Sequence, residues 1–319
     1  FTGSIRNAGE YAAGIMCYGN HGTVSGCEVD ADIDCPDCLV GGIMAGNYGE
    51  TIVRDCTVAG SVAGRLVGGI AGNCYSLSLY DCTVTATVDL AVSSDNTDAR
   101  GAGGIAYAVL NIDNCHMKTP MNIRHYDRNI CVGGICAAAP AGYRCDVTNC
   151  TSKGVTCFAD SGSAIGGIAG GGAGNEQYLE LYNCRVDGNV RLYVDGDKAT
   201  VGGIVGRTGC SVYNCAVNGN VSVHADIPQG TQGRGSVFAG GIAGDMYSNG
   251  NEEDYVVSSC YHMGSVSATY SGEPAPYVHT DHPLVGEGGK IRNCNFAINP
   301  HPVDSLIFHM RLLVGRTGM

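Results

Sequence analysis

Carboxylate side chains that could support hydrolysis gather in the second half of the chain, at Asp195, Asp197, Asp226 and Asp281. Cleavage of a glycosidic bond needs two carboxyl groups about 5 to 9.5 Å apart, or a base beside a charge-stabilising cation. Few charged residues lie in the alternating apolar segments around them, and no acid and base recur together at a fixed spacing. The pattern therefore favours a non-catalytic protein, and a polysaccharide lyase or glycosidase of β-helix type is the alternative.

Cysteine is the second reactive residue type, with 18 in 319 residues. The segment Cys35-Pro36-Asp37-Cys38 has the spacing of a redox or zinc half-site. No second Cys-x-x-Cys and no paired histidines follow it at zinc-site spacing. The segment therefore favours a structural role over a metal or redox site.

Two further segments resemble ligand sites but have simpler explanations. The glycine-rich stretch 166–174 is not followed by a helix pattern, and phosphate-binding loops need a helix N-terminus. The acidic turn 251–254 could bind calcium, but a solvated acidic turn is the more common case. The sequence thus predicts no cofactor and no metal site.

The dominant pattern is a repeat that runs along nearly the whole chain. A Gly-Gly-Ile triplet is followed by a cysteine that usually comes after Asn or Asp. Self-similarity with a period of about 20 to 50 residues is typical of solenoids, in which each unit buries its apolar face against its neighbours. Triplets begin at 41, 68, 103, 133, 166, 202 and 240, and the cysteines in step with them, here called the ladder cysteines, are Cys27, Cys56, Cys82, Cys115, Cys150, Cys184, Cys215, Cys260 and Cys294.

Within each repeat the residues alternate with period two. Cys215, Val217, Gly219, Val221 and Val223 fall on one face, which indicates a strand with that face buried. The residue three before each ladder cysteine is also apolar, so the backbone must bend between the two. The Asn or Asp before the cysteine suits that corner because it tolerates left-handed backbone. Helix-period spacing is absent, and glycine in a helix costs about 1 kcal/mol per site.

These features predict an all-β fold, a parallel β-solenoid (β-helix) of about nine coils over residues 1–296. The general rule for parallel crossovers favours a right-handed coil. Residues 297–319 depart from the repeat and are expected to form a short C-terminal cap. Thiols stacked inward in parallel are poorly placed for a disulfide dihedral of about 90°. We therefore expect the ladder cysteines to be free and buried, while the other cysteines could pair locally.

The segment Gly202-Gly203-Ile204-Val205-Gly206, followed by Val212-Tyr213-Asn214-Cys215, resembles the GLUG motif. This short repeat occurs in bacterial secreted and surface proteins, including adhesins and the non-catalytic portions of immunoglobulin A peptidases. The resemblance covers roughly residues 12–296. It implies a surface β-solenoid and brings no catalytic residues, so it supports a secreted or cell-surface module that acts as an adhesin or stalk.

Composition narrows the partners. The formal net charge is −12, with 18 Lys and Arg against 30 Asp and Glu, whereas nucleic-acid surfaces need clustered basic residues. No apolar run reaches the roughly 18 residues that a membrane-spanning helix requires. We therefore expect no nucleic-acid partner and no membrane insertion. Because Phe1-Thr2-Gly3 resembles the closing segment of a repeat, we also expect the chain to be part of a longer one.

Insertions of unequal length separate the closing strand of a repeat from the next triplet, at roughly 89–102, 124–132, 191–200, 222–239 and 267–283. Because they enter at the same corner, they must project from one edge, and such insertions often form the binding face of a solenoid. The expected partner is a host or bacterial surface protein or glycan. The candidate binding residues are Asp95, Asp98, Arg100, Arg124, His125, Tyr126, Tyr193, Asp195, Asp197, His224, Asp226, Tyr277, His279, Asp281 and His282.

Overall fold

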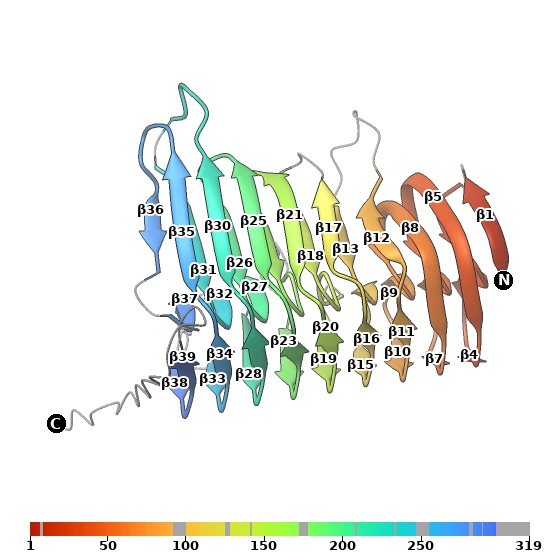
Figure 1. Cartoon of the computed structure of the whole chain (residues 1–319). Helices are drawn as coiled ribbons and strands as arrows, with labels where there is room; N and C mark the ends of the chain where they lie inside the picture. Colours follow the sequence, from red (N-terminus) through yellow and green to blue (C-terminus); the bar gives the residue numbers. More distant parts are fainter. Residues whose placement is uncertain are drawn as a thin grey trace, which may run out of the picture.

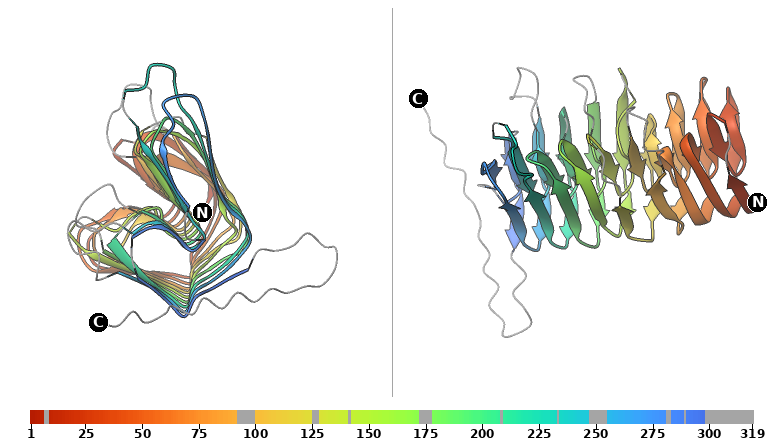
Figure 2. Two further views of the ribbon diagram at one scale, coloured as in Figure 1. Left: turned by 90° about the vertical axis from the view of Figure 1, so that its left-hand side faces the viewer. Right: turned by 90° about the horizontal axis from the view of Figure 1, so that it is seen from above.

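The computed structural model describes residues 1–6, 9–91, 100–124, 128–140, 142–171, 178–207, 209–232, 234–246, 255–280, 283–288 and 290–297. Every regular element in these segments is a β-strand, and the strand pairings among them are parallel. The strands stand side by side in chain order from the N-terminal to the C-terminal end (Figure 1). Seen along that direction, successive repeats lie nearly over one another (Figure 2). The all-β, parallel architecture is thus confirmed, and it is consistent with a β-solenoid-like fold.

One row of strands leads into the ladder cysteines. It forms a nine-stranded sheet within the described residues. The apolar residues three positions before the cysteines are in register, as Val53 with Leu79 and Leu79 with Ile112. The strands are β4 (Gly22–Ser25), β7 (Thr51–Arg54), β10 (Leu77–Tyr80), β15 (Asn111–Asp113), β19 (Arg144–Thr148), β23 (Tyr178–Tyr182), β28 (Gly209–Tyr213), β33 (Val256–Ser258) and β38 (Lys290–Arg292).

A second row begins directly after the ladder cysteines and belongs to the largest sheet. The first two strands of this row are long and continue to the first glycine of the next triplet, whereas the later strands of the row are short. The strands are β5 (Glu28–Gly41), β8 (Thr57–Gly68), β11 (Thr83–Val84), β16 (His116–Met117), β20 (Thr151–Ser152), β24 (Arg185–Val186), β29 (Ala216–Asn218), β34 (Tyr261–Met263) and β39 (Asn295–Ala297).

The closing strands continue from this row. They are β1 (Thr2–Arg6), β12 (Thr87–Leu90), β17 (Met121–Arg124), β21 (Val155–Asp160), β25 (Val190–Asp195), β30 (Val221–Asp226) and β35 (Val266–Ser271). The alternation predicts a glycine inside a continuous strand, and Gly60 does lie inside β8, whereas Gly219 separates β29 from β30 and Gly188 separates β24 from β25. A Cβ at Gly219 would lie 2.2 Å from the carbonyl oxygen of Gly188, so the bend needs glycine for close backbone packing.

The return strands run from the loops into the Gly-Gly-Ile triplets. They are β2 (Tyr11–Ala13), β13 (Gly101–Gly103), β18 (Cys131–Gly133), β22 (Ser163–Gly166), β26 (Ala199–Gly202), β31 (Ser236–Gly240) and β36 (Tyr277–His279). After the triplets come β3 (Met16–Gly19), β6 (Met44–Asn47), β9 (Ala71–Cys74), β14 (Ala106–Ala108), β27 (Val205–Arg207), β32 (Ala243–Asp245) and β37 (Val285–Glu287). These last strands form two sheets, one of β3, β6, β9 and β14 and one of β27, β32 and β37. Isolated parallel bridges from Ala106 through Cys136 and Ala169 to Val205 connect the two sheets.

The corner before each ladder cysteine has left-handed backbone, as the sequence predicts. The values of φ are 54° at Asp81, 57° at Asn149, 54° at Asn183 and 52° at Asn214. Asn214 Nδ2 donates to Asn183 Oδ1 at 2.7 Å, and Asn183 Nδ2 donates to Asn149 Oδ1 at 3.2 Å. The corner therefore carries its own ladder of side-chain hydrogen bonds from one repeat to the next.

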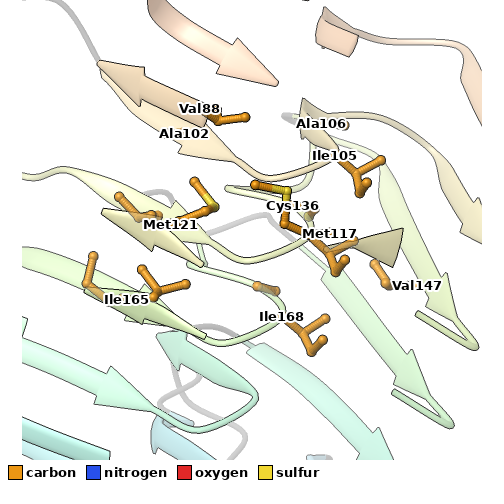
Figure 3. Packing of buried hydrophobic residues seen from close by; sticks show 14 of the residues in the cluster. Val88, Ala102, Ile105, Ala106, Met117, Met121, Cys136, Val147, Ile165 and Ile168 are labelled. Atoms are coloured by element: carbon orange, nitrogen blue, oxygen red, sulfur yellow. The ribbon is translucent and has the colours of Figure 1, made fainter. Parts of the chain in front are cut away.

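The core is a set of columns in which equivalent side chains stack. Ile105 and Ile168 of the triplets are fully buried beside Met117 and Val147 (Figure 3). The ladder cysteines are buried except for the half-buried Cys27 and Cys294 at the two ends, and all of them are free thiols. Predictions of inward, unpaired ladder cysteines are thus confirmed.

Candidate binding surface at the loop edge

The closing strands end along one margin of the molecule, here called the loop edge (Figure 1). Parallel pairing brings Asp160, Asp195, Asp226 and Ser271, the last residues of four closing strands, into register. The segments that follow lead back to the return strands. The common edge predicted for insertions 191–200, 222–239 and 267–283 is confirmed for their described residues.

Five predicted loop residues lie on closing strands and not in loops: Arg124, Tyr193, Asp195, His224 and Asp226. Tyr193 is 38% exposed, and its ring stacks on that of Phe158 with centroids 4.7 Å apart and an interplanar angle of 11°. The Arg124 guanidinium carbon lies 5.8 Å from the centre of the Phe158 ring. Because these side chains present their flat faces to one another, the column stabilises the sheet more than it offers a ring face to a ligand.

A second column carries the carboxylates at the strand ends. Asp226 Oδ1 accepts hydrogen bonds from Ser271 Oγ at 2.5 Å and pairs with His224 Nε2 at 3.1 Å. His224 Nδ1 lies 2.7 Å from Thr269 Oγ1. The Ser271 hydrogen bond and the nearby imidazole lower the pKa of Asp226 below its usual value. Asp226 is therefore an ionised acceptor whose hydrogen-bond partners are residues of the same chain.

Asp195, the strand partner of Asp226, borders an open groove of about 590 Å³ together with Asp197. Three successive repeats line it, together with Arg128: Asp160 and Ser161 at the end of β21, residues 195–198 at the end of β25, and Pro228, Thr231 and Gln232 after β30. Ser161 Oγ donates to Asp197 Oδ1 at 3.1 Å. The sequence did not single out Asp160, Ser161 or Lys198. The signal was available in the similar turns Asp160-Ser161-Gly162 and Asp195-Gly196-Asp197.

Tyr277 and His279 lie on the return strand β36 and do not line the groove. The Arg234 guanidinium carbon is 5.9 Å from the centre of the Tyr277 ring. His279 stacks on Phe238 with centroids 4.5 Å apart, and its Nδ1 lies 3.3 Å from Glu287 Oε2. These contacts pair the side chains with neighbouring strands, so the candidate residues do not form one site.

The remaining candidate residues divide into two groups. Arg100 is only 7% exposed, so the expectation of an exposed loop position is wrong for it: it directly precedes β13, which is paired on both sides, with β8 and β18. Asp95, Asp98, His125, Tyr126, Asp281 and His282 lie outside the described residues, as do the acidic turn 251–254 and residues 298–319 of the expected cap.

The Cys35-Pro36-Asp37-Cys38 segment is part of the scaffold. Cys35 and Cys38 are buried at a bulge in β5, Asp37 between them has φ of 66°, and Cys38 Sγ donates to Gly9 O at 2.7 Å. Burial raises the pKa of the Cys38 thiol. Both thiols are free, and their burial favours the structural interpretation over nucleophilic chemistry.

The glycine triplets are also structural. A Cβ on Gly167 would lie 2.2 Å from Gly203 O, and a Cβ on Gly166 would lie 1.9 Å from Ala169 O. Gly166 is therefore required by a close approach within its own turn, and Gly167 by the close approach of the next repeat. In the described parts of the chain, no group of three or more His, Cys, Asp or Glu side chains is arranged to hold a metal ion. The same segments contain no helix that could cross a membrane.

Comparison with known proteins adds no assignment. No protein-family model, no curated protein and no solved structure matches the chain. The resemblance to the GLUG motif therefore stays a prediction.

Proposed function

We propose that the strands form one continuous right-handed β-solenoid of about nine coils, akin to the GLUG-motif repeats that the sequence resembles. Two observations support this proposal. Paired residues on the closing strands of successive repeats follow chain order, as in the series Asp160, Asp195 and Asp226. The corner asparagines also form hydrogen bonds from one repeat to the next. The handedness follows the general rule for parallel crossovers.

The proposed function is display. The chain is a non-catalytic, secreted or cell-surface module, an adhesin or stalk, whose loop edge binds a protein or glycan on a host or bacterial surface. One observation carries this: turns of unequal length leave a regular scaffold at one edge and enclose a polar groove. Loops held by a rigid scaffold commonly carry function. The net charge of −12 argues against nucleic acid as the partner.

A polysaccharide lyase or glycosidase is the second candidate. It is favoured by Asp160 and Asp195, which are in register on neighbouring strands and both border the groove. A general acid in a glycosidase needs a raised pKa. The pKa of Asp226, a carboxylate of the same edge that does not line the groove, is lowered, so Asp226 is unsuited to the role of proton donor.

A combined binding and turnover screen tests the proposal. The purified chain is applied to immobilised glycans and bacterial or host surface proteins, and both retained protein and released sugar are measured. We expect retention without release. Release of shortened oligosaccharides that stops in Asp160→Asn and Asp195→Asn would establish the enzyme, and failure to bind any glycan or protein would refute display.

A further inference from the structure

The groove at the loop edge is held in shape by backbone hydrogen bonds between its turns. Gly162 N donates to Lys198 O at 2.7 Å, and Gly196 N donates to Asp226 O at 2.7 Å. Asn129 N donates to Ser161 O at 3.2 Å. Four successive repeats are thereby joined at their turns. A ligand that enters the groove need not order the turns first, which removes one cost of binding.

Glycine makes this arrangement possible at one position. Gly196 has φ of 151°, and a Cβ there would lie 2.6 Å from the Cβ of Ser161. A larger residue would force the second turn away from the first. The close approach sets Asp195 and Asp197, on either side of Gly196, against the preceding turn, where both border the groove.

The lining is polar and offers both donors and acceptors. Carboxylates come from Asp160, Asp195 and Asp197, an ammonium from Lys198 and a guanidinium from Arg128. The turn at 228–232 adds a hydroxyl and an amide. Vicinal hydroxyl groups of a sugar both donate and accept, so a carboxylate beside a cationic donor is a fitting partner for them.

The charge balance decides between classes of glycan. Three carboxylates face one guanidinium and one ammonium in the lining, and the whole chain has a formal net charge of −12. A uronic acid or sulfated sugar would meet net repulsion, and like-charge contacts disfavour a partner. A neutral sugar meets no such penalty.

The same lining argues against a peptide. Peptide and protein interfaces depend on aromatic or arginine anchors seated in apolar pockets. None of the residues that line this groove is aromatic, and its one arginine, Arg128, shares the lining with three carboxylates. The rings of Phe158 and Tyr193 nearby are stacked on each other. The volume of about 590 Å³ lies within the range of about 300–1,000 Å³ typical of small-ligand sites.

We propose that this groove binds a glycan segment that carries no carboxylate or sulfate group, with Asp195 and Asp197 accepting hydrogen bonds from sugar hydroxyls and Lys198 donating to sugar oxygens. The inference rests on the proposed function, and it specifies which ligand the display module takes and where.

Isothermal titration of the whole chain with cellopentaose, chitopentaose and pentagalacturonate tests this assignment. We expect at least one neutral pentasaccharide to bind more tightly than pentagalacturonate. Asp195→Asn and Asp197→Asn should each weaken that binding about tenfold, because a hydrogen bond to a charged acceptor is replaced by one to a neutral acceptor. Lys198→Gln removes the ammonium donor and should likewise weaken neutral-sugar binding, while the backbone carbonyl that accepts the hydrogen bond from Gly162 stays in place.

Asp32→Asn is the matched control. Asp32 lies on the outer face of β5, accepts a hydrogen bond from Ser61 at 2.8 Å and does not line the groove, so it removes the same charge elsewhere. We expect its affinity to stay within twofold of the parent. Thermal unfolding of each variant shows that the fold is kept.

The outcomes separate the two levels of proposal. Neutral-sugar binding that is equal in all variants, or tighter binding of pentagalacturonate, overturns the groove assignment and leaves display through another surface intact. No binding of any of the three sugars also overturns the groove assignment, whereas display itself falls only if the wider screen of glycans and surface proteins is negative too.

Discussion

Replacing Gly203 by alanine tests whether the Gly-Gly-Ile triplet is a packing device. A Cβ at Gly203 would lie 2.0 Å from Gly241 O and 2.9 Å from a methyl carbon of Val217, whereas ordinary contacts begin at 3.4 Å. The next repeat would have to move away. That movement opposes the hydrogen bonds from Gly203 N to Gly240 O at 3.0 Å and from Ile204 N to Ile242 O at 2.8 Å.

The expected loss of stability follows from these contacts. Each of the two hydrogen bonds contributes about 1 kcal/mol, and overpacking a close-packed interior costs about 1–3 kcal/mol. We therefore expect Gly203→Ala to lower the free energy of unfolding by about 3–5 kcal/mol. This is a large part of the roughly 5–15 kcal/mol that stabilises a typical protein.

Urea unfolding followed by circular dichroism measures the effect. Gly9→Ala is the matched control, because Gly9 is exposed and no described atom lies within 4 Å of a Cβ placed there. Its unfolding free energy should change by less than about 0.5 kcal/mol. Equal midpoints for Gly203→Ala and the parent chain, or an equal loss in both variants, would refute the packing argument.

Three further predictions concern the columns. Burial lowers the pKa of His262 below its usual 6.5, so the unfolded chain takes up a proton before the folded chain does. The free energy of unfolding should therefore fall as the pH drops below about 6.5, and it should fall less in His262→Val. Urea midpoints measured across pH test both. Iodoacetamide should label the exposed Cys17 in the folded chain but should label Cys82 only after unfolding, as peptide mass spectrometry will show. Cys82 is buried, and its pKa is raised to about 12, chiefly by a hydrogen bond with the next ladder thiol. Asn183→Ala should lower the melting temperature by placing a Cβ-bearing residue without an Asx side chain at φ of 54°, a cost of about 1–2 kcal/mol, whereas Asn183→Gly should lose less.

The architecture could be predicted because its signals are local. The left-handed corner at Asn214, the inward Cys215 and the apolar Val212 three positions before it follow from residue type and alternation alone. Each requirement recurs in every repeat, so the sequence displays it many times. The columns that these residues form need no information about distant parts of the chain.

The site could not be predicted in the same way, because it depends on register across a bend. Asp160 and Asp195 are paired on neighbouring strands, yet one more residue separates Asp195 from Cys184 than separates Asp160 from Cys150. The break before β25 is one residue longer than the break before β21, and it absorbs the extra residue. Period-two counting from the ladder cysteine therefore assigns the two aspartates to opposite faces. The same uncertainty placed Tyr193 in a loop and not on its strand.

Stacking in register gives a separate test of whether Asp195 serves binding. Asp195 and Asp226 are partners on adjacent closing strands, which lie about 4.8 Å apart, and two like charges about 4 Å apart in water repel by about 1 kcal/mol. Asp226 has Ser271 and His224 as partners, and removing the charge of Asp195 leaves those contacts in place.

Asp195→Asn should therefore raise the free energy of unfolding by a few tenths of a kcal/mol up to about 1 kcal/mol, and the gain should shrink as salt screens the pair. If the same substitution weakens neutral-sugar binding, the carboxylate lowers stability while it serves the ligand, as is common for functional residues. Unfolding curves at low and high salt measure the gain. A loss of stability in Asp195→Asn would mean that the carboxylate supports the fold, and this explanation of its presence at the groove would be wrong.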